Sequence, residues 1–473
     1  MSNHESLRSS ATVPQVLLGL ALLGQGLLSA LSFGLAQAEF RRVPSQYSQI
    51  QLAIDYADPG DVILVAPGTY SGPGNINLDF HGKELICRSE EGAAVTIIDA
   101  QQESGYRNGF QLSSGETRAS VIQGFTIING YNPYGGAISC INASPTIRAC
   151  VIRDCLAFFG GGISFDQSGG LIQDTLVEEC SVIGLPVSGQ GGGGIYMRNS
   201  SGRVEDTVVR GNHIDEFSFP GSGIYMSGGG ALLRCTVTGN AGGSGVFASL
   251  TQIDHCTIAY NRSTELQIDF VCDITSSIIA NGCGQSLVSL SPTAWATASC
   301  TMVDPDRVVT NGGTFTYLTP AIDASPLFCL APFCANVPTT IGSFHVEPTS
   351  LARPENNECE DFLGANTSDT CVAAGVDPQP VGLLGPNSIA PNPSRGETSL
   401  RFRLPAQSSV RVSLLDLQGR RLASLLEESR EAGDQTWSGD LRAIPGLRLA
   451  PGVYLIEVKA AGLRETARMV LLP

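Results

Sequence analysis

One short phrase recurs seven times between residues 120 and 282, and this repetition constrains the fold more than any other feature. It consists of an apolar residue, a Cys, Thr, Ser or Phe three positions later, a second apolar residue, and a closing Asn, Cys or Gly. The first apolar positions, spaced 25, 25, 32, 28, 21 and 21 residues apart, are Ile122, Ile147, Ile172, Val204, Leu232, Ile253 and Ile274. The second apolar positions are Ile127, Ile152, Val177, Val209, Val237, Ile258 and Ile279. The closing positions are Gly130, Cys155, Cys180, Asn212, Asn240, Asn261 and Gly282.

A second phrase, clearest as GGAISC, GGGISF and GGGIYM, runs in step with the first. Its anchors, spaced 25, 32, 29, 22 and 22 residues apart, are Ile138, Ile163, Ile195, Ile224, Val246 and Ile268. Two short strands per period indicate a solenoid, because each repeat can bury its apolar face only against the next one. The leucine frame of leucine-rich repeats is missing, and no helix-length pattern fits within the period. The sequence therefore predicts an all-β parallel β-helix whose insertions bulge from the turns.

The start of the chain carries the pattern of an exported protein. Residues 16–35 are mostly apolar, follow a short stretch that holds Arg8, and end in Ala36-Gln37-Ala38, a small-x-small cleavage pattern. We interpret residues 1–38 as a secretory signal peptide that is cut before Glu39. An uncleaved membrane anchor is the alternative, because the stretch is long enough to span a bilayer.

The region after the predicted signal peptide has the features of a solenoid cap. Residues 48–56 are amphipathic and end at Pro59-Gly60, which predicts a short helix. Residues 62–66 form an apolar run that predicts a buried strand. Such a helix would cover the open end of the solenoid, where core and strand edges are otherwise exposed.

These strings together carry a family resemblance. VPSQYSQIQLAIDYADPGDVILVAPGTY, GKELICRSEEGAAVTIIDAQ and GFTIINGY, followed by GGAISC and SPTIRACVIRDC, resemble the secreted bacterial right-handed parallel β-helix proteins of the pectate-lyase-like superfamily. The resemblance covers roughly residues 40–345. It implies a right-handed β-helix over 39–345, with 283–345 as closing coils and cap. It leaves function open, because that superfamily includes polysaccharide lyases, glycoside hydrolases, esterases, adhesins and surface proteins.

The pattern changes again after residue 345. Residues 346–386 predict a linker with a cystine loop, and 387–473 show strand alternation with turns at Gln418-Gly419 and Pro451-Gly452, which is typical of an Ig-like β-sandwich. Pro391-Asn392-Pro393, Trp437 and Gly452-Val453-Tyr454 resemble the C-terminal Ig-like domain of FlgD-type hook-capping proteins and type IX secretion sorting domains. The resemblance implies sorting or anchoring, with secretion machinery as partner and no catalytic residue. A plain Ig-like spacer is the alternative.

Charge narrows the choice of partners. Residues 39–386 hold 15 Arg and Lys against 34 Asp and Glu, whereas 387–473 hold 12 against 9. A region as acidic as residues 39–386 repels a phosphate backbone, which argues against a nucleic acid as binding partner. No cofactor is expected. The acidic run Glu355, Glu358, Glu360 and Asp361 is the one place where Ca²⁺ is conceivable, and a solvated loop is the preferred interpretation.

All fourteen cysteines lie between Cys87 and Cys371. Export would permit disulfides. Cys155 and Cys180 share a column on adjacent coils, as do Cys235 and Cys256, and neighbouring strands lie close enough for a bond. A column of free buried thiols is the equal alternative. The pairs that are close in sequence and could staple loops are Cys283–Cys300, Cys329–Cys334 and Cys359–Cys371.

The best candidate binding surface follows from side-chain alternation in the second phrase. Each anchor faces inward, so the next residue faces outward. These outward residues are Ser139, Ser164, Tyr196, Tyr225, Phe247 and Asp269. We expect the three consecutive aromatic residues to form a flat platform on which sugar rings could stack. Inserted loops could wall a groove that holds the further candidate ligand-binding residues Asp215, Glu216 and Arg198. The alternative is an aromatic ladder that only stabilises neighbouring coils and is covered by those loops.

Two further columns bear on catalysis. Arg153, Glu178 and Arg210 alternate in sign on consecutive coils, which suits ion pairs of little energy. Asp174 and Asp206 share a column, but at a bend where Asp often bonds the backbone. A glycosidase needs paired carboxylates across a cleft, and the signature residues of the lyase families do not occur at matching positions. No catalytic residue or metal ligand is therefore assigned.

The sequence favours a secreted or cell-surface scaffold without catalytic activity. Its β-helix would bind a polysaccharide or an extracellular matrix component, and its C-terminal domain would serve sorting. The first alternative is a polysaccharide lyase or glycoside hydrolase with its groove over Tyr196, Tyr225 and Phe247. The second is a passive surface spacer.

Overall fold

The computed structural model describes most of the chain. The described residues of the N-terminal part are 38–101, 105–183, 191–215, 220–284, 286–319, 321–330, 339–340 and 343–365. In the C-terminal part they are residues 389–390, 394, 396–404, 408–415, 420–431, 433–444, 447, 449–450, 452–460 and 463–471. The predicted signal peptide, except for Ala38, lies outside the described residues. No helix within the described ranges has the length and apolar character needed to cross a membrane.

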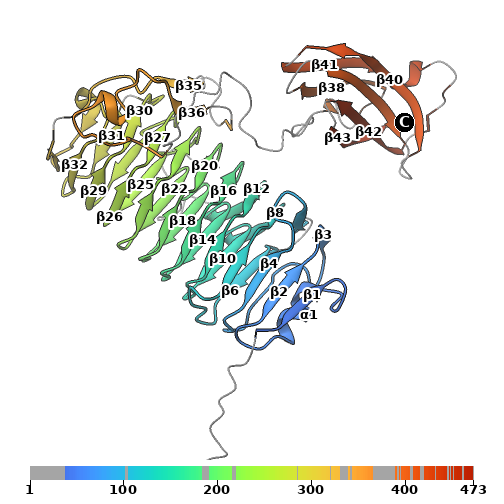
Figure 1. Ribbon diagram of the computed structural model, residues 1–473, viewed down its shortest axis with the longest axis horizontal. Helices are drawn as coiled ribbons and strands as arrows, with labels where there is room; N and C mark the ends of the chain where they lie inside the picture. Colours follow the sequence, from blue (N-terminus) through green and yellow to red (C-terminus); the bar gives the residue numbers. More distant parts are fainter. Residues whose placement is uncertain are drawn as a thin grey trace, which may run out of the picture.

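The N-terminal part is a parallel β-helix whose coils stack side by side (Figure 1). A first sheet of 12 strands runs its whole length. Its strands are β1 (Phe40–Val43), β2 (Val62–Val65), β4 (Ile86–Ser89), β7 (Val121–Gln123), β11 (Thr146–Arg148), β15 (Leu171–Gln173), β19 (Arg203–Glu205), β23 (Ala231–Leu233), β26 (Thr251–Asp254), β29 (Val271–Thr275), β32 (Trp295–Ser299) and β34 (Thr314–Tyr317).

A second sheet of 9 strands follows the first around each coil. Its strands are β3 (Gly68–Ser71), β5 (Thr96–Asp99), β8 (Thr126–Ile128), β12 (Val151–Arg153), β16 (Leu176–Glu178), β20 (Val208–Arg210), β24 (Thr236–Thr238), β27 (Thr257–Ala259) and β30 (Ile278–Ala280). A corner sheet of 4 short strands adjoins it in the central coils. These are β9 (Tyr131–Tyr134), β13 (Leu156–Phe159), β17 (Ser181–Val182) and β21 (His213–Ile214).

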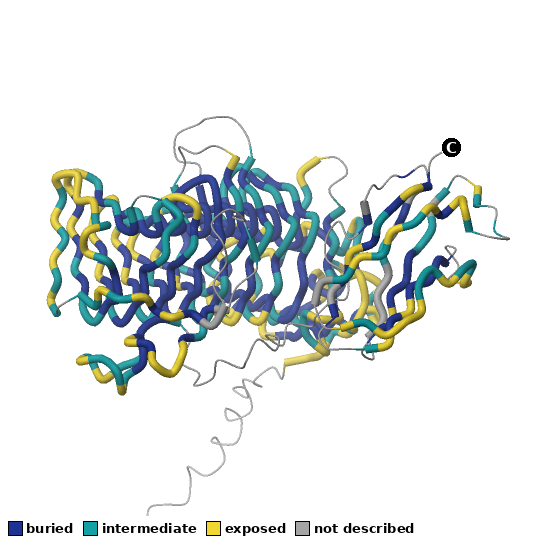
Figure 2. The backbone as a smooth tube through the Cα atoms, turned by 90° about the horizontal axis from the view of Figure 1, so that it is seen from above, coloured by how far each residue is buried: buried dark blue, intermediate teal, exposed yellow. Residues whose placement is uncertain are grey.

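A third sheet of 9 strands completes the coil. Its strands are β6 (Phe110–Leu112), β10 (Ile138–Ile141), β14 (Ile163–Asp166), β18 (Ile195–Arg198), β22 (Ile224–Ser227), β25 (Val246–Ser249), β28 (Leu266–Ile268), β31 (Val288–Leu290) and β33 (Val308–Val309). Buried residues recur from coil to coil along the solenoid, so one continuous apolar core fills it (Figure 2).

The register predicted from the first phrase is confirmed. All seven first anchors pair in order along the first sheet, from Ile122 to Ile274, and none is exposed. The second apolar positions pair in the same way along the second sheet, from Ile127 to Ile279. The all-β right-handed solenoid is therefore the fold of this region.

The prediction of two strands per coil was too low. On each coil the residues of the first phrase form two strands that are separated by a bend. One residue at this bend has a positive φ, as in Asp174 (48°), Asp206 (49°) and Arg234 (54°). A left-handed residue turns the chain so that the apolar positions on both sides of it point inward. The bend therefore explains why one uninterrupted phrase serves two sheets.

The register predicted from the second phrase holds for five of its six anchors and fails at the last. Ile138 to Val246 pair in sequence order. Val246 then pairs with Leu266, whereas Ile268 pairs with Ala248. Gln267 rather than Asp269 consequently follows Phe247 on the outer face. The two apolar residues Leu266 and Ile268 both face inward, so alternation alone does not separate the two registers.

The closing positions form a polar ladder inside the solenoid. The side-chain carbonyl of Asn240 accepts the backbone N–H of Asn212 at 2.9 Å, and that of Asn261 accepts the N–H of Asn240 at 3.0 Å. The next closing residue, Gly282, has no side chain. Glu265 takes its place: its carboxylate is buried and accepts both the backbone N–H and the side-chain amide of Asn261. The ladder thus pairs backbone groups that would otherwise be buried without partners.

The predicted cap helix is present as α1 (Ile50–Asp55), shorter than the expected residues 48–56. Its buried residues Ile50, Ala53 and Ile54 join the solenoid core. The Lys83 ammonium donates to the carbonyls of Ile54, Asp55 and Ala57 at 2.9–3.0 Å. A cation at the carbonyls that end a helix stabilises this end.

The end of the solenoid is covered by a segment that the sequence analysis assigned partly to a linker. Strands β35 (Phe328–Leu330) and β36 (Ser343–Val346) pair antiparallel, and residues 347–365 follow. Phe344, Ala352 and Leu363 pack on outward-facing residues of the second sheet such as Ile278. Cys300 and Cys359 form a disulfide. The described part of 346–386 is therefore packed onto the last coils.

The C-terminal part consists of two small antiparallel sheets. The first holds β37 (Ile389–Ala390), β38 (Glu397–Leu404) and β41 (Gly433–Asp440). The second holds β39 (Ser408–Leu415), β40 (Arg421–Arg430), β42 (Gly452–Ala460) and β43 (Leu463–Leu471). The alternating residues Leu400, Phe402 and Leu404 are buried in their shared core, as the pattern predicted.

Candidate functional site

The predicted aromatic residues lie in one column on the third sheet. Tyr196 pairs with Tyr225, and Tyr225 pairs with Phe247. A pair of glycines precedes each strand, and the first of them has a positive φ, as in Gly192 (68°) and Gly221 (72°). A Cβ on Gly192 would lie 2.4 Å from the carbonyl oxygen of Ile195, so the tight turn requires glycine. The glycine-rich strings therefore position the aromatic strands.

The rings stack on one another along the solenoid. The ring centroids of Tyr196 and Tyr225 are 4.8 Å apart, and those of Tyr225 and Phe247 are 4.6 Å apart with an interplanar angle of 7°. Phe159 lies 5.4 Å from Tyr196, and Tyr134 stacks on Phe159 at 4.9 Å. We call these five residues the aromatic ladder. It is two rings longer than the sequence predicted.

The ladder is not the flat platform that the sequence analysis expected. Tyr196 is 0% exposed, Phe247 is 7% exposed and Tyr225 is half-buried. The ring faces of the inner members already lie against other rings, so they are not available to a sugar. Burial also raises the pKa of the Tyr196 and Tyr225 hydroxyls. The geometry is that of the alternative interpretation, in which the ladder joins neighbouring coils.

The charged residues expected in a groove beside the ladder have separate partners. Arg198 donates from two nitrogens to both carboxylate oxygens of Asp166, at 2.5 and 3.1 Å. Asp215 is exposed and lies 3.4 Å from His213. Asp269 accepts a hydrogen bond from Ser291 at 2.8 Å. Glu216 lies outside the described residues.

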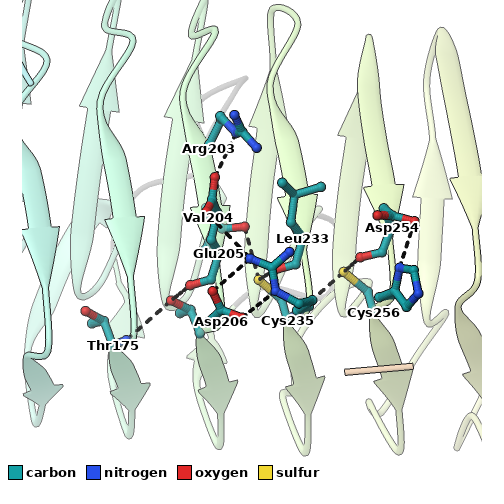
Figure 3. A network of polar contacts seen from close by, with 12 residues as sticks. Thr175, Arg203, Val204, Glu205, Asp206, Leu233, Cys235, Asp254 and Cys256 are labelled. Atoms are coloured by element: carbon teal, nitrogen blue, oxygen red, sulfur yellow. Dashed lines mark hydrogen bonds and ion pairs between the residues drawn. The ribbon is translucent and has the colours of Figure 1, made fainter. Parts of the chain in front are cut away.

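Ion pairs link consecutive coils on the other sheets. Glu178 pairs with Arg210 at 3.0 Å, as expected, whereas Arg153 pairs with its neighbour Asp154. The Asp206 carboxylate (Figure 3) accepts hydrogen bonds of 2.6 and 2.8 Å from the Arg234 guanidinium on the next coil.

The same network continues on both sides of that pair. Arg203 and Arg234 both contact Glu205, at 2.8 and 3.7 Å. Asp254 lies beside His255 in the next coils (Figure 3). Glu205 and Asp206 are thus each paired with an arginine of their own or the next coil.

The cysteines inside the solenoid are free thiols. Cys155, Cys180, Cys235 and Cys256 are all buried and unbonded, as in the second of the two alternatives. Cys155 accepts the backbone N–H of Gly130 at 3.4 Å, so the thiols extend the polar ladder. Burial raises the pKa of Cys180 and Cys256 far above the ordinary thiol value. The thiols of Cys180 and Cys256 are therefore protonated and unreactive.

The cysteines after the solenoid pair differently from the sequence prediction. Cys300 bonds to Cys359, which lies 59 positions later in the sequence, with Cα atoms 5.8 Å apart. Neither Cys283–Cys300 nor Cys359–Cys371 is consequently formed. Cys283 is itself disulfide-bonded. Cys334, Cys371 and the side chain of Cys329 lie outside the described residues.

Three carboxylates of the acidic run, Glu355, Glu358 and Glu360, are exposed, as the solvated-loop interpretation expected. The fourth, Asp361, is partly buried. The carboxylate of Asp361 accepts from Ser276 at 2.9 Å and lies 3.1 Å from the His255 ring. Glu355 pairs with Arg353 at 2.6 Å. Within the described residues, no three His, Cys, Asp or Glu side chains gather as metal ligands would.

An exposed aromatic region that the sequence analysis did not identify lies on the last coils. Trp295 in β32 is 68% exposed and pairs with Val271 in β29. Phe270, which is 50% exposed, precedes β29, and its carbonyl accepts the backbone N–H of Trp295 at 2.6 Å. We call Phe270, Val271 and Trp295 the exposed strip. A single exposed tryptophan leaves no repeat in the sequence, so periodicity does not reveal it.

A comparison with known protein families supports the fold of the solenoid. The sequence model of the right-handed beta helix region family matches residues 86–261. No curated protein matches the chain. The structure of pectate lyase Pel9A has a TM-score of 0.34 and 14% identity, and the match covers 67% of this chain and 92% of that chain.

Two further solved structures are more distant. The catalytic domain of a GH87 alpha-1,3-glucanase in complex with nigerose has a TM-score of 0.29 and 11% identity, over 60% of this chain and 68% of that chain. The tailspike protein gp49 from Acinetobacter baumannii bacteriophage Fri1, a capsular polysaccharide depolymerase, has a TM-score of 0.23 and 8% identity, over 92% and 78%. The family match places the right-handed β-helix in the same coils that carry the aromatic ladder.

Proposed function

We propose that this protein is a secreted or cell-surface scaffold that binds polysaccharide without cleaving it. The observation that carries the proposal is the pairing of three carboxylates of the central coils with arginines of the next coil. Asp166, Glu178 and Asp206 each contact an Arg guanidinium at 3.0 Å or less. A carboxylate whose oxygens are bound by a guanidinium is not positioned to transfer a proton to a substrate, and a glycosidase needs two carboxylates facing one cleft.

The composition and the start of the chain support an extracellular location. Residues 1–38 have the pattern of a cleaved signal peptide, and the solenoid that follows is strongly acidic. The C-terminal antiparallel sheets would then act in sorting or attachment, as their resemblance to hook-capping and type IX secretion sorting domains implies. Deleting 387–473 is expected to release the solenoid from the cell envelope or to block its export, which fractionation would detect.

Affinity electrophoresis of the mature chain tests the binding function. The chain would be run in gels cast with dextran, galactomannan, chitosan or polygalacturonate, with and without Ca²⁺, and the gels would then be stained for polymer. Retardation without a cleared zone supports the proposal. A cleared zone would instead establish the alternative, a polysaccharide lyase or hydrolase. Normal migration in every gel would contradict binding and favour the passive spacer.

A further inference from the structure

The exposed strip lies on the outer face of the first sheet, at the end of the solenoid. Strands β29 and β32 are neighbours there (Figure 1), and β34 pairs with β32 on the other side. Val271 pairs with Trp295, and Trp295 pairs with Thr314. Because side chains alternate along a strand, the buried neighbours Cys272 and Ala296 point into the core and the strip points outward. The backbone of two paired strands therefore fixes the position of the indole.

Polar side chains run alongside the strip in the next outward row. Gln252, Asp273, Thr297 and Thr316 pair in that order on four consecutive strands. The Thr297 hydroxyl donates to the Asp273 carboxylate at 2.7 Å, which orients both groups. Neighbouring strands are about 4.8 Å apart, so this row offers regularly spaced hydrogen-bonding groups beside an open aromatic ring.

The size and charge of this surface indicate which class of ligand it can bind. A stable protein interface takes roughly 20–30 residues from each partner, and an apolar strip of three residues is far smaller. Asp269 and Asp273 are exposed beside it, in a solenoid region that carries 34 acidic residues against 15 basic ones. This charge disfavours nucleic acids and acidic polysaccharides. An uncharged sugar has both an apolar ring face for Trp295 and hydroxyl donors for Asp273.

We propose that the exposed strip binds a neutral polysaccharide, with one sugar ring stacked on Trp295 and its hydroxyls bonded to Asp273 and Thr297. This inference rests on the proposed binding function and names its site and its class of ligand. The proposed site is Trp295 and not the aromatic ladder, whose ring faces lie against other rings. The neighbours of Trp295 on the adjacent strands are Val271 and Thr314. The indole face is consequently free of aromatic stacking partners in its own column.

The test compares Trp295→Ala with Tyr56→Ala in the full mature chain. Tyr56 is a matched control because it is an aromatic residue that is 66% exposed, at the opposite end of the solenoid. Affinity electrophoresis in dextran and galactomannan gels would give the dissociation constants. We expect Trp295→Ala to weaken binding by at least about tenfold, as for an aromatic anchor, and Tyr56→Ala to leave it unchanged.

The outcomes separate this inference from the proposed function. Equal retardation of the wild type and Trp295→Ala would overturn the site while leaving polysaccharide binding intact. Retardation of the wild type by polygalacturonate alone would overturn the class of ligand. Normal migration of the wild type in every gel would overturn both. Trp295→Phe is expected to recover part of the affinity, which a purely structural role of this exposed side chain would not produce.

Discussion

The aromatic ladder and the exposed strip belong to the same solenoid, yet the rings of the ladder stack on one another whereas Trp295 of the strip is exposed. In the ladder, Tyr196, Tyr225 and Phe247 occupy the same column on successive coils, and ring centroids 4.8 and 4.6 Å apart show that their rings stack between neighbouring strands. In the strip, Trp295 has Val271 before it and Thr314 after it. Repetition of rings therefore produces cohesion between coils, whereas an isolated ring remains open to a ligand.

The two regions therefore differ in what their rings contribute to, which is stability in the ladder and ligand binding in the strip. A stacked and buried ring contributes to the free energy of unfolding through burial and through ring–ring contact. An exposed ring contributes little to stability, because it loses little surface to water on folding. Substitutions in the ladder should therefore change stability, and substitutions in the strip should change binding.

The largest effect is expected from the ladder. Tyr196→Ala removes a fully buried ring between two aromatic neighbours and should destabilise the solenoid by about 3–5 kcal/mol. Urea denaturation followed by circular dichroism would measure the shift of the midpoint. Tyr56→Ala, at an exposed aromatic residue, should stay within about 0.5 kcal/mol. A loss below about 1 kcal/mol for Tyr196→Ala would refute the cohesive role of the ladder.

The second prediction concerns pH and the coils between the two regions. Burial raises the pKa of Glu265 to about 8, although the amide of Asn261 and the charge of Arg307 oppose the shift. Between its ordinary value of 4.5 and about 8, the folded state keeps a proton that the unfolded state has lost. Stability should therefore fall as pH rises, by at most about 1.4 kcal/mol per pH unit.

Thermal unfolding at pH 5, 7 and 9 would measure this slope. The effect should be strong at pH 5 to 8 and should level off above the folded pKa. Glu265→Gln should flatten the profile, since an amide does not titrate in this range. A Glu265→Gln profile as steep as that of the wild type would show that other groups cause the pH dependence.

The smallest effect is expected at the polar row beside the strip. Asp273→Asn keeps the shape of the side chain but removes its charge, so hydrogen bonds from sugar hydroxyls weaken. One such bond contributes about 1 kcal/mol, which corresponds to roughly fivefold weaker binding. The denaturation midpoint should not move, because Asp273 is exposed. Unchanged affinity for dextran and galactomannan would limit the site to Trp295.

The sequence was sufficient to predict which apolar residues face the core. It was insufficient to predict how the side chains on the outer surface are arranged. Apolar residues such as Ile122 and Ile127 recur with fixed spacing because each must face the interior on every coil. The bend between the two apolar positions was expected at Asp174 and Asp206 but was not recognised on every coil, because its left-handed residue can also be Ala149, Arg234 or His255. The disulfide Cys300–Cys359 joins residues that are distant in the chain, and spacing does not indicate such pairs.

The candidate site shows the same limit. The sequence predicted that Tyr196, Tyr225 and Phe247 share a column, and this is correct. Whether stacked rings turn their faces outward or toward each other depends on side-chain torsions, which alternation does not determine. Trp295 escaped notice because it lies outside the glycine-marked strands, where no repeated signal draws attention to it.

The most direct test measures stability and polysaccharide binding on the same two variants, Tyr196→Ala and Trp295→Ala. Each would be examined by urea denaturation and by affinity electrophoresis in galactomannan gels. The account predicts that Tyr196→Ala lowers the denaturation midpoint while the folded protein still binds, and that Trp295→Ala keeps the midpoint and loses binding. If folded Tyr196→Ala lost binding while Trp295→Ala retained it, the ladder would be the binding site and the account would be wrong.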